Sequence, residues 1–248
     1  MEIRGSAVLV TGASRGLGAA LSRALARERA RVVLVARGAA DLEKVVADIR
    51  GQAGEAHVLA ADIGAKDDIY RIAGAAAALV GPLDLVVHNA STLGPTPLKP
   101  LLDTECEELV RVLDVNLVGP FRLTKAVAGG MAVRGRGLVV NVTSDASVSA
   151  YPTWGAYSVS KAALDHLGRV WAEELAESGV RFLTVDPGEM DTAMHADAMP
   201  EADRTTLADP AAVADRIVDI VRHAEQIPSG ARLEAASWRG SGALGQAS

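Results

Sequence analysis

The chain has 248 residues, 49% of them hydrophobic, and its 25 lysines and arginines stand against 31 aspartates and glutamates for a formal net charge of -6. This composition allows a sizeable core, and the lack of a basic tract argues against nucleic-acid binding. No apolar run approaches the ~20 residues of a membrane-spanning helix, and the N-terminus lacks a secretion signal, so we expect a cytoplasmic protein.

Apolar runs typical of buried strands alternate with amphipathic helical patterns along the chain. The predicted strands lie near residues 7–11, 31–36, 56–60, 83–88, 137–143, 180–185 and 231–235. The predicted helices lie near residues 17–28, 40–50, 66–80, 103–130, 155–178 and 210–224. The alternation predicts an α/β fold, a Rossmann-type doubly wound parallel sheet of about seven strands with helices on both faces. We expect a single domain over residues 1–238 and a disordered tail, rich in Gly, Ser and Ala, over 239–248.

A glycine-rich turn follows the first predicted strand. Residues 8–10 lead into Thr11-Gly12-Ala13-Ser14-Arg15-Gly16-Leu17-Gly18, after which an amphipathic helix begins. Backbone amides at such a turn and at a helix N-terminus bind phosphate, and glycines let the backbone approach it closely. The spacing, Thr-Gly-x-x-x-Gly-x-Gly, differs from the common dinucleotide fingerprint Gly-x-Gly-x-x-Gly.

Tyr157 and Lys161 lie four residues apart, on one face of a predicted helix. Because an ammonium beside a phenol favours the phenolate, we expect Lys161 to lower the pKa of Tyr157 from its usual value near ~10. Ser144, just after an earlier apolar run, offers a hydroxyl to the same reacting oxygen. Such a site suits proton transfer at a carbonyl or an alcohol. Taken alone, the spacing is a weak signal that two exposed helix residues would explain better.

In combination these motifs resemble the short-chain dehydrogenase/reductase family over about residues 8–192. The other matching residues follow in family order: Asp62 after a strand, Asn89-Ala90 after Leu85-Val86-Val87, Asn116 in a helix, and Pro187-Gly188 with Thr192 after Lys161. Two segments depart from the family pattern. His88-Asn89-Ala90-Ser91 replaces the common Asn-Asn-Ala-Gly, and residues 229–234 carry no Asp-Gly-Gly ending. The second departure puts in doubt any oligomer contact built from the usual C-terminus.

The resemblance implies a role for each matching residue. Tyr157 is implied to be the general acid/base, Lys161 to lower its pKa and hold the ribose, Ser144 to bind the substrate oxygen, and Asn116 to hold a water that links Lys161 to solvent. The implied cofactor-binding residues are Gly12, Ser14, Arg15, Gly16, Leu17, Gly18, Arg37, Asp62, Ile63, Asn89, Ala90, Tyr157, Lys161, Pro187, Gly188 and Thr192.

The end of the second predicted strand bears on the choice of cofactor. An NAD-preferring site carries an acidic side chain there for the ribose 2′-hydroxyl, but this chain has Ala36-Arg37. Arg37 offers a guanidinium suited to a 2′-phosphate, and Arg15 matches the second basic position of NADP-preferring family members. Together they favour NADP(H), although each alone would also fit a solvated surface charge.

The expected substrate wall consists of Asp145, Tyr151, Trp154, Glu189 and Met190, with a modest lid over residues 192–210. The aromatic residues suggest a flat or apolar substrate, although each of these side chains would equally fit packing or surface. We expect an NADP(H)-dependent reductase of a ketone or aldehyde, or the reverse reaction. Two alternatives stay open: a regulatory or scaffold protein that binds the cofactor without turnover, and an epimerase or dehydratase of the wider family.

No metal is predicted, because no histidine shows ligand spacing and the single Cys106 lies in an acidic helix start typical of a surface residue. Family members commonly form dimers or tetramers through two long helices, here near 103–130 and 155–178. The resemblance therefore implies a homodimer or homotetramer. Trp171 and Leu175 belong either to that interface or to the monomer core.

Overall fold

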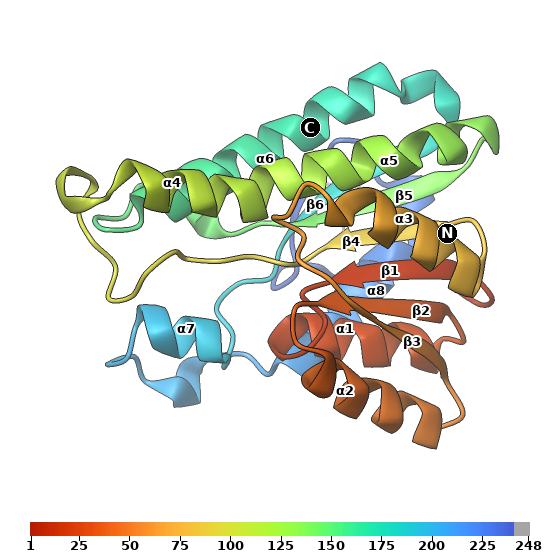
Figure 1. Cartoon of the computed structure of the whole chain (residues 1–248), viewed down its shortest axis with the longest axis horizontal. Helices are drawn as coiled ribbons and strands as arrows, with labels where there is room; N and C mark the ends of the chain where they lie inside the picture. Colours follow the sequence, from red (N-terminus) through yellow and green to blue (C-terminus); the bar gives the residue numbers. More distant parts are fainter. Residues whose placement is uncertain (241–248) are drawn as a thin grey trace.

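The computed structural model describes residues 1–240 (Figure 1). Its strands are β1 (Ala7–Thr11), β2 (Arg31–Ala36), β3 (Glu55–Ala60), β4 (Leu85–His88), β5 (Gly137–Val142), β6 (Val180–Asp186) and β7 (Arg232–Glu234). They form one parallel sheet in the order β3-β2-β1-β4-β5-β6-β7. The predicted Rossmann-type sheet of seven parallel strands is confirmed.

The central strands are apolar on both faces because helices cover both. Every residue of β1 is buried, and Val8 pairs with Val32 of β2 on one side and with Leu85 of β4 on the other. Neighbouring residues of β1 face opposite layers, so Val8 packs in one core cluster and Leu9 in the other. Continuous apolar runs of this kind are typical of buried parallel strands.

Helices form a layer on each face of the sheet (Figure 1). The first core cluster is shared by α1 (Gly16–Arg27), α2 (Ala39–Gly51) and α8 (Pro210–Arg222). The second is shared by α3 (Asp68–Val80), α5 (Gly119–Val133) and α6 (Gly155–Glu174). Trp171 and Leu175 pack against this second cluster while partly buried, which assigns them to the monomer core.

The single helix predicted over 103–130 is a series of shorter elements. A 3-10 turn (Leu101–Asp103) precedes α4 (Cys106–Leu113), and a π-helical turn (Asp114–Val118) separates α4 from α5. Pro120, near the start of α5, lacks the N–H that an α-helix would donate to the Asn116 carbonyl, and its ring would crowd that oxygen. The wider turn relieves this conflict, and such turns often occur at functional sites.

A short helix that the sequence patterns did not predict, α7 (Ala193–Ala198), lies in the expected lid. Thr192 caps it, since its Oγ1 accepts a hydrogen bond of 3.2 Å from the N–H of His195. The segment returns to the body of the protein where Met190 and Ala208 form a parallel β-bridge. Six residues are too few for helical periodicity to reveal the element in the sequence.

The last described residues pack on α8. Trp238 is 8% exposed, and its Nε1 donates to Asp219 Oδ2 at 2.7 Å. Of the tail expected to be disordered, residues 241–248 lie outside the described residues. Within residues 1–240, no helix combines the length and the apolar character that crossing a membrane requires.

Candidate active site

Helix α6 brings Tyr157 and Lys161 into the protein interior, one turn apart. Tyr157 is 8% exposed and Lys161 is 2% exposed. Lys161 Nζ donates to the Val142 carbonyl at 2.8 Å, at the end of β5, and lies 5.6 Å from the centre of the Tyr157 ring. Their burial excludes the alternative of two exposed helix residues.

Burial dominates the acid–base behaviour of Tyr157. It raises the pKa of Tyr157 to about 12; the Ser144 hydroxyl opposes this shift, while Asp186 and Asp145 add to it. The direction is opposite to the lowering that the sequence led us to expect from Lys161. The physical reason is that removal from water penalises the phenolate more than the site compensates it. Tyr157 is therefore a neutral proton donor near neutral pH.

Burial also lowers the pKa of Lys161 to about 8, although Asp165 and Asp186 oppose this shift. A lysine with this pKa remains mostly protonated near neutral pH. The pair therefore consists of a neutral phenol and an adjacent ammonium, each shifted by the same desolvation. This arrangement can give up a proton from the phenol and stabilise the negative charge left behind.

Ser144 lies in the turn that follows β5 and takes part in a hydrogen-bond chain. Its Oγ donates to Asp145 Oδ1 at 2.8 Å, and Tyr151 OH donates to Asp145 Oδ2 at 2.7 Å. Burial would raise the pKa of Asp145, but the hydrogen bonds from Tyr151, Ser144 and the Ala146 N–H outweigh it and hold the pKa below its usual value. Asp145 and Tyr151, both expected to contact substrate, thus support the Ser144 turn.

The π turn directs Asn116 inward, where it joins a loop to α6. Asn116 is fully buried; its Oδ1 accepts the Thr92 N–H at 2.8 Å, and its Nδ2 donates to the Thr92 carbonyl and to Ser160 Oγ, both at 2.9 Å. Ser160 Oγ in turn donates to the Tyr157 carbonyl at 2.6 Å. Asn116 therefore fixes the loop after β4 relative to the first turns of α6.

The glycine turn is held against the end of β4. Thr11 Oγ1 accepts the N–H groups of Asn89 and Ala90, both at 3.1 Å, and Asn89 Nδ2 donates to the carbonyls of Thr11 and Gly12 at 3.0 and 3.2 Å. A Cβ on Gly18 would lie 2.2 Å from the Gly12 carbonyl oxygen, so a larger residue does not fit there. Here the strand order reverses between β1 and β4, the place where doubly wound sheets bind nucleotides.

The same turn has the features of a dinucleotide phosphate site. Gly12 and Gly16 adopt φ angles of 67° and 53°, and α1 begins without a side-chain cap and without an acid in its first turn. Ser14 is half-buried and Leu17 is buried beside it. Because free amides at a helix N-terminus bind anionic phosphate, these residues fit the implied cofactor. Thr192 lies over the turn, since a Cβ on Gly16 would be 3.4 Å from Thr192 Cγ2.

The other cofactor candidates surround this turn. Arg15 is the N-cap residue of α1 and Arg37 directly follows β2, and both are exposed. After β3, Asp62 is half-buried and Ile63 is buried, and Asp62 Oδ1 accepts the Gly64 N–H at 2.9 Å. The arginines are thus available to a ligand, whereas Asp62 also shapes its own loop.

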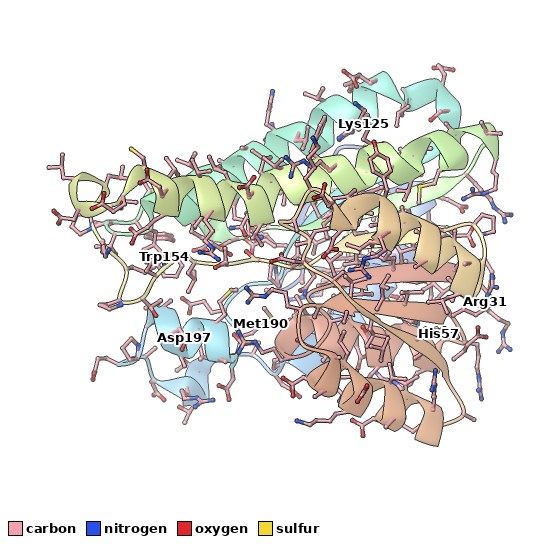
Figure 2. The ribbon with its side chains drawn as sticks, in the orientation of Figure 1. Arg31, His57, Lys125, Trp154, Met190 and Asp197 are labelled. Atoms are coloured by element: carbon pink, nitrogen blue, oxygen red, sulfur yellow. The ribbon has the colours of Figure 1, made fainter. Side chains whose placement is uncertain are left out.

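The expected substrate residues divide between two places. Trp154 meets Tyr157 edge to face, with ring centroids 5.7 Å apart at an interplanar angle of 68°. Met190 packs instead against the core cluster of α1 and α8, and Glu189 is exposed. Figure 2 shows Trp154 and Asp197 of α7 toward one end of the molecule, Met190 nearer its middle and Arg31 toward the other end.

An apolar cleft borders Tyr157 and Trp154. Leu93 and Leu98 line it from the loop after β4, and Met194 of α7 packs in the same cluster. Met194, rather than Met190, therefore packs against the hydrophobic cluster that contains Tyr157. The sequence did not single out Leu93 or Leu98, because residues in a loop show no periodicity.

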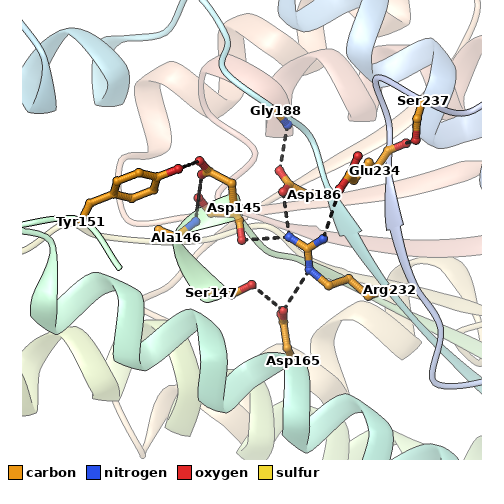
Figure 3. Close-up of polar contacts among 11 residues, drawn as sticks. Asp145, Ala146, Ser147, Tyr151, Asp165, Asp186, Gly188, Arg232, Glu234 and Ser237 are labelled. Carbon is orange, nitrogen blue, oxygen red and sulfur yellow. Dashed lines mark hydrogen bonds and ion pairs between the residues drawn. The ribbon is translucent and has the colours of Figure 1, made fainter. Parts of the chain in front are cut away.

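The sequence patterns also missed an ion-pair cluster beside the site (Figure 3). Arg232 of β7 pairs with Asp165 of α6 and with Asp186 at the end of β6. Asp186 directly precedes the buried Pro187, and Asp186 Oδ1 accepts the Gly188 N–H at 2.9 Å. In the sequence, only the position of Asp186 next to the Pro187-Gly188 motif indicated that it lies near the site. Within residues 1–240, no three His, Cys, Asp or Glu side chains gather as metal ligands would.

Comparison with known proteins identifies the family. A family model described as short chain dehydrogenase matches residues 6–203. Dehydrogenase/reductase SDR family member 4 of Bos taurus is 37% identical over 186 residues, which cover 75% of this chain and 66% of that protein. The chain thus spans just under two thirds of the length of this relative.

Solved structures agree in fold and sequence. A metagenomic short-chain oxidoreductase in complex with NADP matches with a TM-score of 0.80 and 32% identity, over 94% of this chain and 99% of that one. The 7 alpha-hydroxysteroid dehydrogenase complexed with NADH and 7-oxo glycochenodeoxycholic acid matches with a TM-score of 0.87 and 27% identity, over 94% of each chain. The chain belongs to the short-chain dehydrogenase/reductase family of oxidoreductases.

Proposed function

We propose that this oxidoreductase uses NADP(H) to reduce a ketone or aldehyde to an alcohol, or catalyses the reverse, with one catalytic domain over residues 1–238. The observation that carries the proposal is the buried, neutral Tyr157 beside Ser144 and Lys161. An exposed phenol exchanges its proton with water, whereas a buried one can transfer it to a bound carbonyl. Solved relatives bound to NADP or to NADH with an oxo-steroid support the reaction class.

Each residue of the site has a distinct part in this reaction. NADPH, when bound, supplies the hydride. As negative charge develops on the carbonyl oxygen, Tyr157 donates its phenolic proton to it, and the Ser144 hydroxyl turns from Asp145 to donate a hydrogen bond to it. Lys161, held by the Val142 carbonyl, stabilises the phenolate left after the transfer. Asn116 holds α6 and the loop after β4 together beside Tyr157 and Lys161.

The main test follows NADPH consumption against a panel of ketones, aldehydes, diketones and quinones. Tyr157→Phe should lower turnover by about 10²–10⁴-fold, the usual contribution of a positioned general acid. Tyr70→Phe is the matched control, because Tyr70 is 75% exposed on α3. Near-wild-type turnover in Tyr157→Phe would contradict the mechanism. Tight NADPH binding with no turnover on the panel would favour the regulatory or scaffold alternative.

Preference for NADP(H) rests on Arg15 and Arg37. Both guanidiniums are exposed at the edge of the glycine turn and of β2, and Ala36-Arg37 supplies no acid for a ribose 2′-hydroxyl. Arg37→Asp should therefore move the NADPH/NADH ratio of kcat/KM toward NADH by about tenfold or more. Arg216→Asp, the same charge change at an exposed position of α8, should leave the ratio unchanged. An unaltered ratio in Arg37→Asp would refute this preference.

Other contacts of the cofactor follow from the same placement. The N–H groups of residues 12–18 would hold the phosphates, and Asp62 with Ile63 would border the adenine. The nicotinamide side would be bordered by Asn89, Ala90, Pro187, Gly188 and Thr192.

We further propose a homodimer or homotetramer formed through α4, α5 and α6. Large apolar side chains are exposed there, including Val110 (56%), Val159 (53%) and Val170 (39%). Light scattering on wild type and Val159→Glu would test this, since a charge in a buried interface should dissociate it. A wild-type monomer would refute the proposal.

A further inference from the structure

Arg232, in the last strand, lies between two buried carboxylates from different elements (Figure 3). Its Nη2 is 2.8 Å from Asp186 Oδ2, and its Nε is 3.3 Å from Asp165 Oδ2. Asp165 is 3% exposed and Asp186 is 6% exposed. Ser147 also donates to Asp165 Oδ2, at 2.6 Å, whereas Asp165 Oδ1 has no hydrogen-bond partner in the described structure. Both acids therefore depend on Arg232 for a compensating charge.

The same guanidinium reaches the backbone of the proposed catalytic residue. Arg232 Nη2 donates to the Ser144 carbonyl at 3.2 Å, and Asp186, its ion-pair partner, accepts the Gly188 N–H at 2.9 Å. One side chain thus connects the turn that carries Ser144 with the loop that begins at Pro187. Arginine suits this position because its planar fork can bind several oxygens at fixed angles.

The cluster also balances charge around the tyrosine–lysine pair. Lys161 and Arg232 supply two positive charges, and Asp165 and Asp186 supply two negative ones, all in or at the edge of the interior. Both acids act electrostatically on Lys161, and Asp186 also acts on Tyr157. Removal of the Arg232 charge would leave the buried cluster with a net negative charge.

Other charged groups lie around the same cluster on neighbouring elements. They are Asp145 in the turn after β5, which acts electrostatically on Tyr157, Glu234 on β7, whose Oε1 is 3.7 Å from Arg232 Nη1, and the Lys99–Glu108 ion pair at the cleft. Of these, Glu234 is largely exposed and Lys99 and Glu108 neutralise one another. Arg232 is the cation that contacts both acids acting on Lys161.

We propose that Arg232 is a positioning residue of the catalytic centre, which fixes the Ser144 turn through its carbonyl and balances Asp165 and Asp186 so that Tyr157 can exchange its proton at the pH of turnover. This inference rests on the proposed function. It assigns a purpose to the segment 229–234, where the family's usual ending is missing.

The test compares wild type with Arg232→Met and Arg232→Lys. Arg232→Met should lower kcat by about 10–100-fold, because small displacements of a reacting group are costly, with a smaller loss of NADPH affinity measured by fluorescence. Its pH profile should move upward by on the order of one pH unit in both reaction directions, since a missing positive charge favours the protonated forms of Lys161 and Tyr157, and the pKa of Lys161 is about 8 in wild type. Arg232→Lys keeps the charge but not the fork, so kcat should fall while the profile stays near that of wild type.

Two controls separate positioning from a loss of folding. Glu234→Gln removes the exposed member of the cluster and should leave kcat and the pH profile unchanged. Arg181→Met removes a half-buried arginine that binds the Ala224 carbonyl elsewhere on the same sheet, and should lower stability without moving the profile.

A folded Arg232→Met enzyme with wild-type kcat and an unshifted profile would overturn the proposal. If that variant fails to fold, Arg232→Lys decides, and wild-type kcat in it would overturn the proposal. Turnover that survives Tyr157→Phe would instead refute the proposed function, an outcome that the Arg232 variants do not produce.

Discussion

His88 makes the protein acid-sensitive in a way that one substitution should remove. It occupies the first position of the Asn-Asn-Ala-Gly pattern, at the end of β4, and is 2% exposed. Its Nε2 lies 2.9 Å from Thr124 Oγ1, while its Nδ1 has no hydrogen-bond partner within the described residues. Burial lowers the pKa of His88 from 6.5 to about 3. The folded protein therefore keeps this imidazole neutral well below neutral pH.

The size of the effect follows from linkage. The unfolded chain binds a proton at His88 as the pH falls through about 6.5, whereas the folded chain does so only near 3, so stability is lost between these values. At pH 5, His88 should cost about 2 kcal/mol relative to pH 7, and at pH 3 or below the cost approaches about 5 kcal/mol. A loss of 2 kcal/mol is a large fraction of the stability of an ordinary domain.

The assay is urea unfolding, followed by tryptophan fluorescence at pH 7 and pH 5. Wild type should lose about 2 kcal/mol more between the two pH values than His88→Asn, which cannot take up a proton. Comparing the losses within each protein cancels other titrating groups and any fixed cost of the substitution. His166→Asn, at an exposed position of α6, should behave like wild type. Equal losses in wild type and His88→Asn would refute the reasoning.

Three further substitutions test the site. Gly18→Ala should abolish NADPH binding in a fluorescence titration and destabilise the protein, because its Cβ would lie 2.2 Å from the Gly12 carbonyl oxygen; wild-type affinity would contradict the packing. Asn116→Leu leaves the half-buried Thr92 N–H without its acceptor and should cost about 1–3 kcal/mol in urea unfolding, with a fall in kcat. Trp154→Ala should raise KM for the carbonyl more than it lowers kcat in steady-state assays, since Trp154 borders the cleft.

The central strands could be predicted from sequence because each is a buried apolar run bounded by turn residues, whereas β3 and β7 are only partly buried. All six expected helices correspond to helical segments, but the sequence pattern over 103–130 did not reveal the π turn within that segment. That turn depends on Pro120 and on Gly119, where a Cβ would lie 2.4 Å from the Ile63 carbonyl oxygen. A contact between residues so distant in sequence has no local pattern that predicts it.

The candidate site shows the same division. The spacing of residues identified Tyr157, Lys161 and the glycine turn as candidates, because helical pitch and phosphate-binding geometry are local properties of the chain. The direction of the Tyr157 pKa shift was wrong, since it is set by burial and not by its neighbour in the helix. Arg232 and Asp165 were missed because 67 residues separate them in the chain.

The residues proposed for catalysis and those that border the cleft lie in different parts of this molecule, and they are held in different ways. The groups that support the proposed catalytic tyrosine are fixed by partners in the sheet and in a long helix, as Lys161 is by Val142 and Asn116 by Ser160. Leu98 of a loop lines the apolar cleft, and Met194 of the six-residue helix α7 packs in the hydrophobic cluster beside it. Rigid elements hold reacting groups more accurately than loops do, whereas loops tolerate change. Substrate preference can therefore diverge through the loop and α7 while the chemistry at Tyr157 stays the same.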